Sequence, residues 1–107
     1  MAIKQLSADD FEELIKNKKV KLIDVRELLE FQQGHIKGAK LMPSTNFSEE
    51  LEKNKLKKSD KIALYCRSGS RSNFIAEQLE QMGYNNIFNL EMGILEWLDY
   101  KKKLVKK

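Results

Sequence analysis

Residues Lys61–Ser72 read KIALYCRSGSRS and join an apolar strand, a polar loop and the start of a helix. The stretch Lys61–Tyr65 is typical of a buried parallel strand. Cys66 follows it directly, and the loop behind Cys66 contains only Arg, Ser and Gly. Gly69 permits positive φ, and small side chains let successive backbone N–H groups converge on an anion. The stretch therefore predicts a buried strand followed by an anion-binding loop, with the cysteine at the start of the loop.

The loop also favours the thiolate form of its cysteine. Arginine side chains and the N-terminus of the following helix both place positive charge beside the sulfur. Arg71 stands at the helix start, where its charge opposes the helix dipole, so we expect it to pair with an acid or a bound anion. Arg67 is either a substrate contact or a surface charge. The predicted site consists of Cys66 as nucleophile and a substrate-binding loop of Arg67, Ser68, Gly69, Ser70 and Arg71.

Strands and helices alternate along the rest of the chain. Apolar runs predict strands at 20–25, 39–41, 61–65 and 87–90, and helical patterns follow Ser7, Glu27, Phe47, Ser70 and Gly93. This alternation predicts an α/β domain with a mainly parallel sheet and helices on both faces. Ligands bind such sheets beyond the carboxyl ends of the strands. Asp24 ends one strand and Cys66 follows another, so both belong to that edge.

Four further residues have a structural and a functional interpretation. Asp24 and Arg26 support the loop as charges near the pocket, or they form an ion pair that ties a strand end to a helix start. His35 follows a glycine in a turn and is expected to be structural. Trp97 shares helical spacing with apolar neighbours and is expected in the core.

The length and the distribution of charge limit the classes of protein to which this chain can belong. A length of 107 residues fits one domain, and the formal net charge is +4. Five lysines lie within 101–107, and the remaining chain carries 15 basic and 16 acidic residues. The positive charge therefore belongs to the tail, and a nucleic-acid-binding face is not predicted.

One Cys and one His exclude an internal disulfide and a zinc site built from these residue types. No apolar run approaches the ~20 residues that cross a bilayer. The N-terminus MAIKQLSADDF lacks the apolar centre of a signal peptide. We therefore expect a cytoplasmic protein without a membrane partner.

Several segments resemble the signatures of rhodanese domains. They are Leu22–Arg26, Glu30-Phe31, Gly34–Ala39, the loop Cys66–Arg71 and the segment Gly83–Trp97. The resemblance extends over roughly Ile3–Tyr100, with the motifs in the family's order and spacing. It implies a three-layer fold with about five strands. We expect a single domain over 1–100 and a Lys-rich extension of the last helix over 101–107.

The resemblance implies a thiosulfate-type sulfurtransferase without a cofactor. Cys66 matches the family position that accepts a sulfane sulfur as a persulfide and passes it on. Small anions such as thiosulfate are the implied donors, and a thiol, cyanide or a protein is the implied acceptor. This chemistry needs one thiolate and an anion pocket.

The chain departs from the family pattern at two positions, and the second of them, Met92, bears on the choice of acceptor. Lys37 stands where Pro is frequent, and Met92 stands where the family often has the first of two glycines. Neither touches the cysteine loop.

Two other functions compete with this one. A persulfide carrier or regulatory module working with a protein partner would use the same cysteine. A Cys-dependent phosphatase or arsenate reductase is disfavoured, because those loops have the longer spacing Cys-x5-Arg and this chain has Cys-x4-Arg between Cys66 and Arg71.

Overall fold

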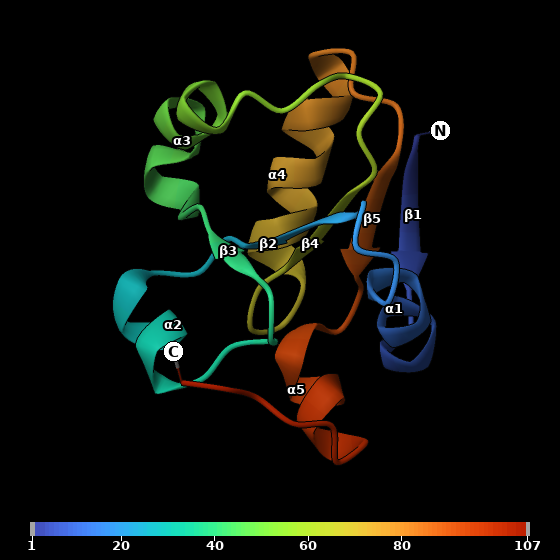
Figure 1. Ribbon diagram of the computed structural model, residues 1–107, viewed down its shortest axis with the longest axis vertical. Coiled ribbons are helices and arrows are strands. Elements are labelled where there is room, and N and C mark those ends of the chain that lie inside the picture. The colour runs from blue at the N-terminus through green and yellow to red at the C-terminus, as the bar shows by residue number, and fades with distance from the viewer. Residues whose placement is uncertain (1, 107) are drawn as a thin grey trace.

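The computed structural model describes residues 2–106, which form one five-stranded parallel sheet with helices on both faces (Figure 1). The strands are β1 (Ile3–Leu6), β2 (Lys21–Asp24), β3 (Lys40–Leu41), β4 (Ile62–Tyr65) and β5 (Ile87–Leu90). The helices are α1 (Ala8–Ile15), α2 (Leu28–Gln33), α3 (Phe47–Asn54), α4 (Ser70–Gln81) and α5 (Gly93–Asp99), with a short 3-10 turn at Ser44–Asn46. The predicted fold class is confirmed.

The strand order is β1-β5-β4-β2-β3, and every pair is parallel. From β2 the chain continues to the edge strand β3. It then crosses back, so that β4 and β5 lie on the side of β2 opposite to β3. The order therefore reverses between β2 and β4, where ligands bind in open α/β sheets. Asp24 pairs in register with Tyr65, so the residues after these two strands meet at the switch point.

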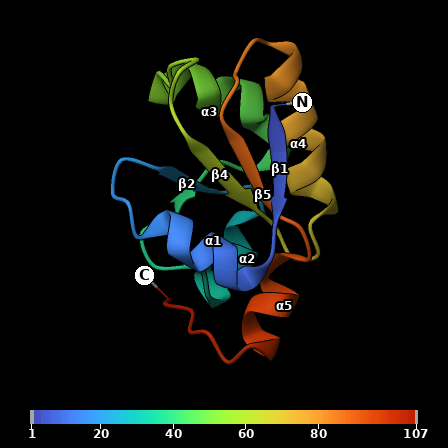
Figure 2. The same ribbon diagram turned by 90° about the vertical axis from the view of Figure 1, so that its right-hand side faces the viewer.

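Side chains of β4 alternate between two apolar layers. Ile62 and Leu64 face α3 and α4, in a core that also contains Leu51 and Leu79. Ala63 and Tyr65 face α1 and α5 on the opposite side, with Phe11, Ile94 and Trp97. All four β4 residues are fully buried, as expected for a central parallel strand. Figure 2 shows α4 on one side of the sheet and α1 with α5 on the other.

Two expectations about single residues are confirmed. His35 is buried, with its ring stacked on Phe31 at a centroid separation of 3.7 Å and Nδ1 2.9 Å from the Phe31 carbonyl oxygen. Trp97 is a core residue whose indole N–H donates to the Lys103 carbonyl at 3.1 Å. Both residues are structural, and both lie against the C-terminal segment.

The structure differs from the sequence prediction at both ends. The strand β1 was not predicted, because Lys4 and Gln5 are exposed and interrupt the apolar pattern of this edge strand. The last helix ends at Asp99, so the expected helical extension is wrong over residues 101–106, and Lys107 lies outside the described residues. Lys101 adopts φ 59°, which turns the chain back, and Val105 pairs with His35 in an antiparallel bridge.

The helices within residues 2–106 include no segment that is both long and apolar enough to cross a membrane.

Candidate active site

Cys66 lies directly after β4 at the switch point, with only 1% of its surface exposed. Its backbone is fixed by a hydrogen bond from the Ile94 N–H to the Cys66 carbonyl at 3.0 Å. The loop that follows runs over the carboxyl end of the sheet and enters α4 at Ser70. β4 and α5 therefore fix the backbone of Cys66, and the loop that follows Cys66 surrounds its sulfur.

Hydrogen-bond donors of the loop converge on the Cys66 sulfur. The Gly69 N–H lies 3.1 Å from Sγ, and the Ser72 N–H lies 3.4 Å from it. The Ser72 hydroxyl oxygen is 3.5 Å from Sγ, but its single proton is donated to Asn89 Oδ1 at 2.6 Å. The two donors to the sulfur are therefore backbone groups at the N-terminus of α4, where the helix dipole is positive. This arrangement complements negative charge on the sulfur, as the loop sequence predicts.

The Ser72 hydroxyl belongs to a chain of polar groups that sequence reasoning missed. It donates to Asn89 Oδ1 at 2.6 Å, and the Asn89 amide donates to Gln5 at 2.8 Å. Gln5 in turn donates to Asn73 Oδ1 at 2.6 Å. Ser72 and Asn89 are buried, whereas Gln5 is exposed. The network joins β1, β5 and α4 behind the sulfur. Only the position of Asn89 in an otherwise apolar strand signals it in the sequence.

Arg71 pairs with Glu30 of α2. Its guanidinium meets both carboxylate oxygens, with Nη1–Oε1 at 2.8 Å and Nη2–Oε2 at 2.9 Å. Glu30 also accepts the Glu27 backbone N–H at 2.9 Å. The hydrogen bonds from Arg71 are the main cause that lowers the pKa of Glu30 to about 2. The sequence predicts that Arg71 pairs with an acid or an anion, and this acid comes from the segment Glu30-Phe31.

Asp24 and Arg26 form the buried ion pair that was one of their two interpretations. Arg26 Nη2 lies 2.7 Å from Asp24 Oδ2 and donates to the Gly34 carbonyl at 2.6 Å. The pair thus ties the end of β2 to the end of α2. Burial, and to a smaller extent the Asp24 carboxylate, raises the pKa of Tyr65, whose hydroxyl accepts the Ile36 N–H.

Two glycines allow the cysteine loop to pack against the turn between β5 and α5. Gly69 has φ +98°, and a Cβ there would lie 1.9 Å from the Glu91 carbonyl oxygen. Gly93 has φ +68°, and a Cβ there would lie 2.2 Å from the Arg67 carbonyl oxygen. Any side chain at either position would force these two backbones apart.

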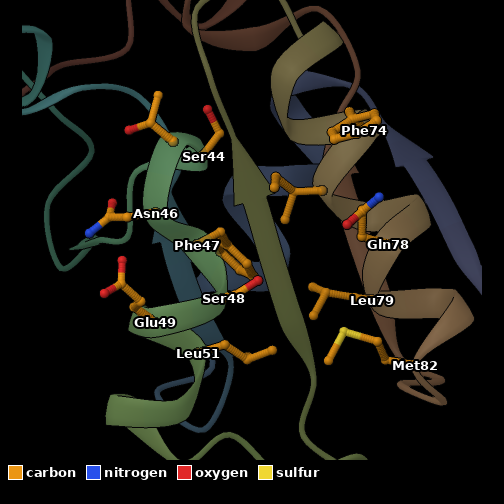
Figure 3. A pocket seen from close by; sticks show the side chains of 12 residues that line it. Ser44, Asn46, Phe47, Ser48, Glu49, Leu51, Phe74, Gln78, Leu79 and Met82 are labelled. Atoms are coloured by element: carbon orange, nitrogen blue, oxygen red, sulfur yellow. The ribbon is translucent and has the colours of Figure 1, made fainter.

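A groove between α3 and α4 is separate from the cysteine loop (Figure 3). Phe47 and Leu51 line it from α3, Leu79 lines it from α4, and Met82 lines it from the residue directly after α4. The described residues that line this groove include none of 66–71. Among residues 2–106 no cluster of three or more His, Cys, Asp or Glu side chains is arranged to hold a metal ion.

The fold and the loop define a class of protein: an α/β domain with one cysteine at the switch point and a loop of donors around its sulfur. Residues 7–100 match the model of the rhodanese-like domain, and the chain belongs to that family. The resemblance predicted from the sequence motifs is confirmed.

Similarity to known proteins extends over most of the chain. It is 34% identical to the putative mitochondrial thiosulfate sulfurtransferase of Schizosaccharomyces pombe, covering 91% of this chain and 81% of that protein. It is 33% identical to the tRNA uridine(34) hydroxylase of Hamiltonella defensa, covering 92% of this chain. The crystal structure of a rhodanese-related protein from Thermoplasma volcanium superposes with a TM-score of 0.85 at 31% identity, covering 97% of this chain and 99% of that one.

Several curated relatives are longer proteins. The chain spans between 29% and 62% of the length of three of them, with the hydroxylase at the lower limit. The region they share is therefore the rhodanese-like domain.

Proposed function

We propose that this chain is a sulfurtransferase that moves a sulfane sulfur from thiosulfate, or from a persulfide donor, to a thiophilic acceptor. The observation that carries the proposal is the convergence of the Gly69 and Ser72 backbone N–H groups on the Cys66 sulfur. Such donors stabilise a thiolate before the reaction and the negative sulfur of a persulfide after it. The name of one relative, the putative thiosulfate sulfurtransferase of Schizosaccharomyces pombe, supports the same class of reaction.

The reaction has two balanced half-reactions. In the first, the Cys66 thiolate attacks the outer sulfur of thiosulfate, a Cys66–S–S⁻ persulfide forms, and sulfite leaves with the electron pair of the broken S–S bond. In the second, cyanide attacks the outer sulfur, thiocyanate leaves, and the electron pair returns to the Cys66 sulfur. Neither half-reaction needs a proton from the protein, so no general base is required.

The loop residues have distinct roles in this proposal. Arg67 is exposed and attracts the anionic donor. Glu30 holds Arg71 in place, so that Arg71 shapes the loop while its charge remains near the sulfur. The exposed Ser68 and Ser70 contribute small side chains that leave the loop amides accessible.

Intact-mass measurement after thiosulfate treatment tests this function. We expect a gain of about 32 Da, one sulfur atom, that cyanide removes with release of thiocyanate. Cys66→Ser is the matched control, because its hydroxyl is nearly isosteric but forms no persulfide. Absence of the mass gain in the folded wild-type protein with both thiosulfate and an organic persulfide would contradict the proposal.

A further inference from the structure

A cavity of about 580 Å³ lies over β2, on the face of the sheet that carries α1. Val20 and Leu22 line it from the sheet, and Ile15 lines it from the end of α1. On this face α1 packs mainly on β1, β5 and α5. Leu22 is therefore only half-buried, although it belongs to the apolar layer that contains Tyr65. The cavity thus has an apolar floor that no helix covers fully.

Hydrogen bonds hold the walls of the cavity in place. In the turn after α1 the Val20 N–H donates to the Asn17 carbonyl at 3.1 Å. On the opposite side the Lys103 carbonyl accepts the Trp97 indole N–H at 3.1 Å. The red segment after α5 runs below α1 in Figure 2. A Cβ at Gly38, which also lines the cavity, would meet no atom within 4 Å, so the cavity is open to solvent there. The space is therefore already formed in this structure.

The charges around the cavity are mostly positive. Four exposed lysines line it: Lys16, Lys18, Lys37 and Lys103. Lys16 is paired with Glu13, but within residues 2–106 no carboxylate lies within ion-pair distance of the other three. Glu12, the one acid among the described residues that line the cavity, is bound by Lys102 at 2.8 Å. Three unpaired ammonium groups around an apolar floor attract an anion.

Two features that stand out in the sequence meet at this cavity. Lys37 stands where the family pattern often has Pro, and Lys103 belongs to the Lys-rich C-terminal end. The turn that contains Lys37 and the returning C-terminal segment bring both side chains to the same space. The proposed sulfur transfer uses neither lysine, and none of the described residues that line the cavity belongs to 66–72. The cavity is therefore separate from the cysteine loop.

We propose that this cavity is a second binding site and that its ligand is a single-chain aliphatic carboxylate, a medium-chain fatty acid. The unpaired ammonium groups bind the carboxylate, and the carbon chain packs on Ile15 and Leu22. The lysine stems extend the apolar surface while their charged ends stay in water.

The size of the cavity agrees with a ligand of this class. A volume of about 580 Å³ lies within the range of ~300–1,000 Å³ that is typical of small-molecule sites. It equals about 19 waters at ~30 Å³ each, which leaves room for a carboxylate with a chain of about ten carbons.

Calorimetry with four dispersed probes tests the ligand class. The probes are decanoate, the shorter hexanoate, acetate as the head group alone, and decanol as the chain alone. We expect decanoate to bind at least tenfold more tightly than hexanoate and at least fivefold more tightly than decanol, and acetate to give no measurable binding. Trp97 is the sole tryptophan of the chain and lines the cavity, so its fluorescence should change with the same saturation curve.

Two triple variants with the same loss of charge test the location. The first removes the unpaired lysines of the cavity: Lys18→Ala, Lys37→Ala and Lys103→Ala. The second removes exposed lysines that do not line it: Lys4→Ala, Lys57→Ala and Lys106→Ala. The first should weaken decanoate at least tenfold and decanol less than twofold, whereas the second should change neither by more than twofold. Cys66→Ser should bind decanoate as wild type does.

Four results would overturn the inference. Equal weakening of decanoate by the two triple variants would show attraction to net charge only. Equal affinities for decanoate and hexanoate would show that the apolar floor is not used. Loss of binding in folded Cys66→Ser would place the ligand at the cysteine loop. Sedimentation with vesicles of phosphatidylcholine and phosphatidylglycerol, without binding of dispersed decanoate, would identify a membrane surface as the ligand instead.

Discussion

Arg71 of the cysteine loop is held by a carboxylate from another helix. Its charge at the first turn of α4 is unfavourable for the helix dipole, and the bidentate contact with Glu30 compensates for this. The contact joins α2 to the cysteine loop across 41 positions of sequence. Arg67 lacks such a partner among residues 2–106, so only one of the two loop arginines is held by a carboxylate.

The Glu30–Arg71 pair predicts a pH dependence of stability. Arg71 lowers the pKa of Glu30 from 4.5 to about 2, so the pair stabilises the folded state above pH 4.5. This contribution is lost as the pH falls from 4.5 through about 2. The side chains are 37% and 30% exposed, so the contribution is discounted to about 1 kcal/mol.

Glu30→Gln tests this dependence through urea unfolding at several pH values. Above pH 5 we expect the variant to be less stable than wild type by about 1 kcal/mol, and the difference should close towards pH 2. Glu13→Gln removes a carboxylate from an exposed pair with Lys16 and serves as the control, with no comparable pH-dependent difference. A constant difference between wild type and Glu30→Gln at all pH values would contradict the pKa argument.

At the scale of elements, the cysteine loop and the β5–α5 turn form one unit. The Ile94 and Leu95 N–H groups donate to the Cys66 and Arg67 carbonyls, and Gly69 and Gly93 permit this close approach. The start of α5 is therefore part of the site. A change in this turn displaces the loop, although the turn is distant from Cys66 in the sequence.

Gly69→Ala tests this packing against a matched control. Its Cβ would collide with the Glu91 carbonyl, whereas Gly38 has φ +90° and open space within 4 Å. We expect Gly38→Ala to cost about 1 kcal/mol for its left-handed backbone alone. Gly69→Ala should cost at least about 3 kcal/mol and slow persulfide formation. Chemical denaturation measures both variants, and equal losses would show that the loop does not depend on this contact.

At the scale of the whole molecule, the segment after α5 folds back and packs against three of the helices. It returns from the end of α5 to His35, supplies the Lys103 carbonyl to Trp97, and brings Leu104 onto Gly34. Lys102 additionally lies within 2.9 Å of carboxylates at Asp9 and Glu12 of α1. The segment thereby connects α1, α2 and α5 at the carboxyl edge of the sheet.

Truncation after Tyr100 should therefore destabilise the fold. The buried Trp97 indole would lose its acceptor, His35 would lose two backbone hydrogen bonds, and Leu104 would no longer cover Gly34. We expect a loss of about 2–4 kcal/mol in the free energy of unfolding. Lys101→Ala and Lys106→Ala, which remove only exposed side chains, should each change stability by less than about 0.5 kcal/mol. Unchanged stability of the truncated chain would show that the segment only rests on the surface.

The sequence alone predicts strands β2 to β5, the start of each helix and the position of the cysteine, because these depend on local patterns. The apolar run Lys61–Tyr65 predicts a buried strand, and a loop of Arg, Ser and Gly predicts an anion site beside Cys66. The packing of two layers on β4 follows from strand alternation. The resemblance to rhodanese domains rests on the same local motifs.

Only the tertiary structure decides which distant groups meet. Glu30 was one of many acids able to pair with Arg71. Asn89 stands out as a polar residue in an apolar strand, but the sequence does not show that its partner is the Ser72 hydroxyl. The C-terminal lysines read as a helix end, but tertiary contacts override that weak local preference and place Leu104 beside the site. Such pairings depend on the free energy of the whole packed domain, since each partner alone has several acceptable neighbours.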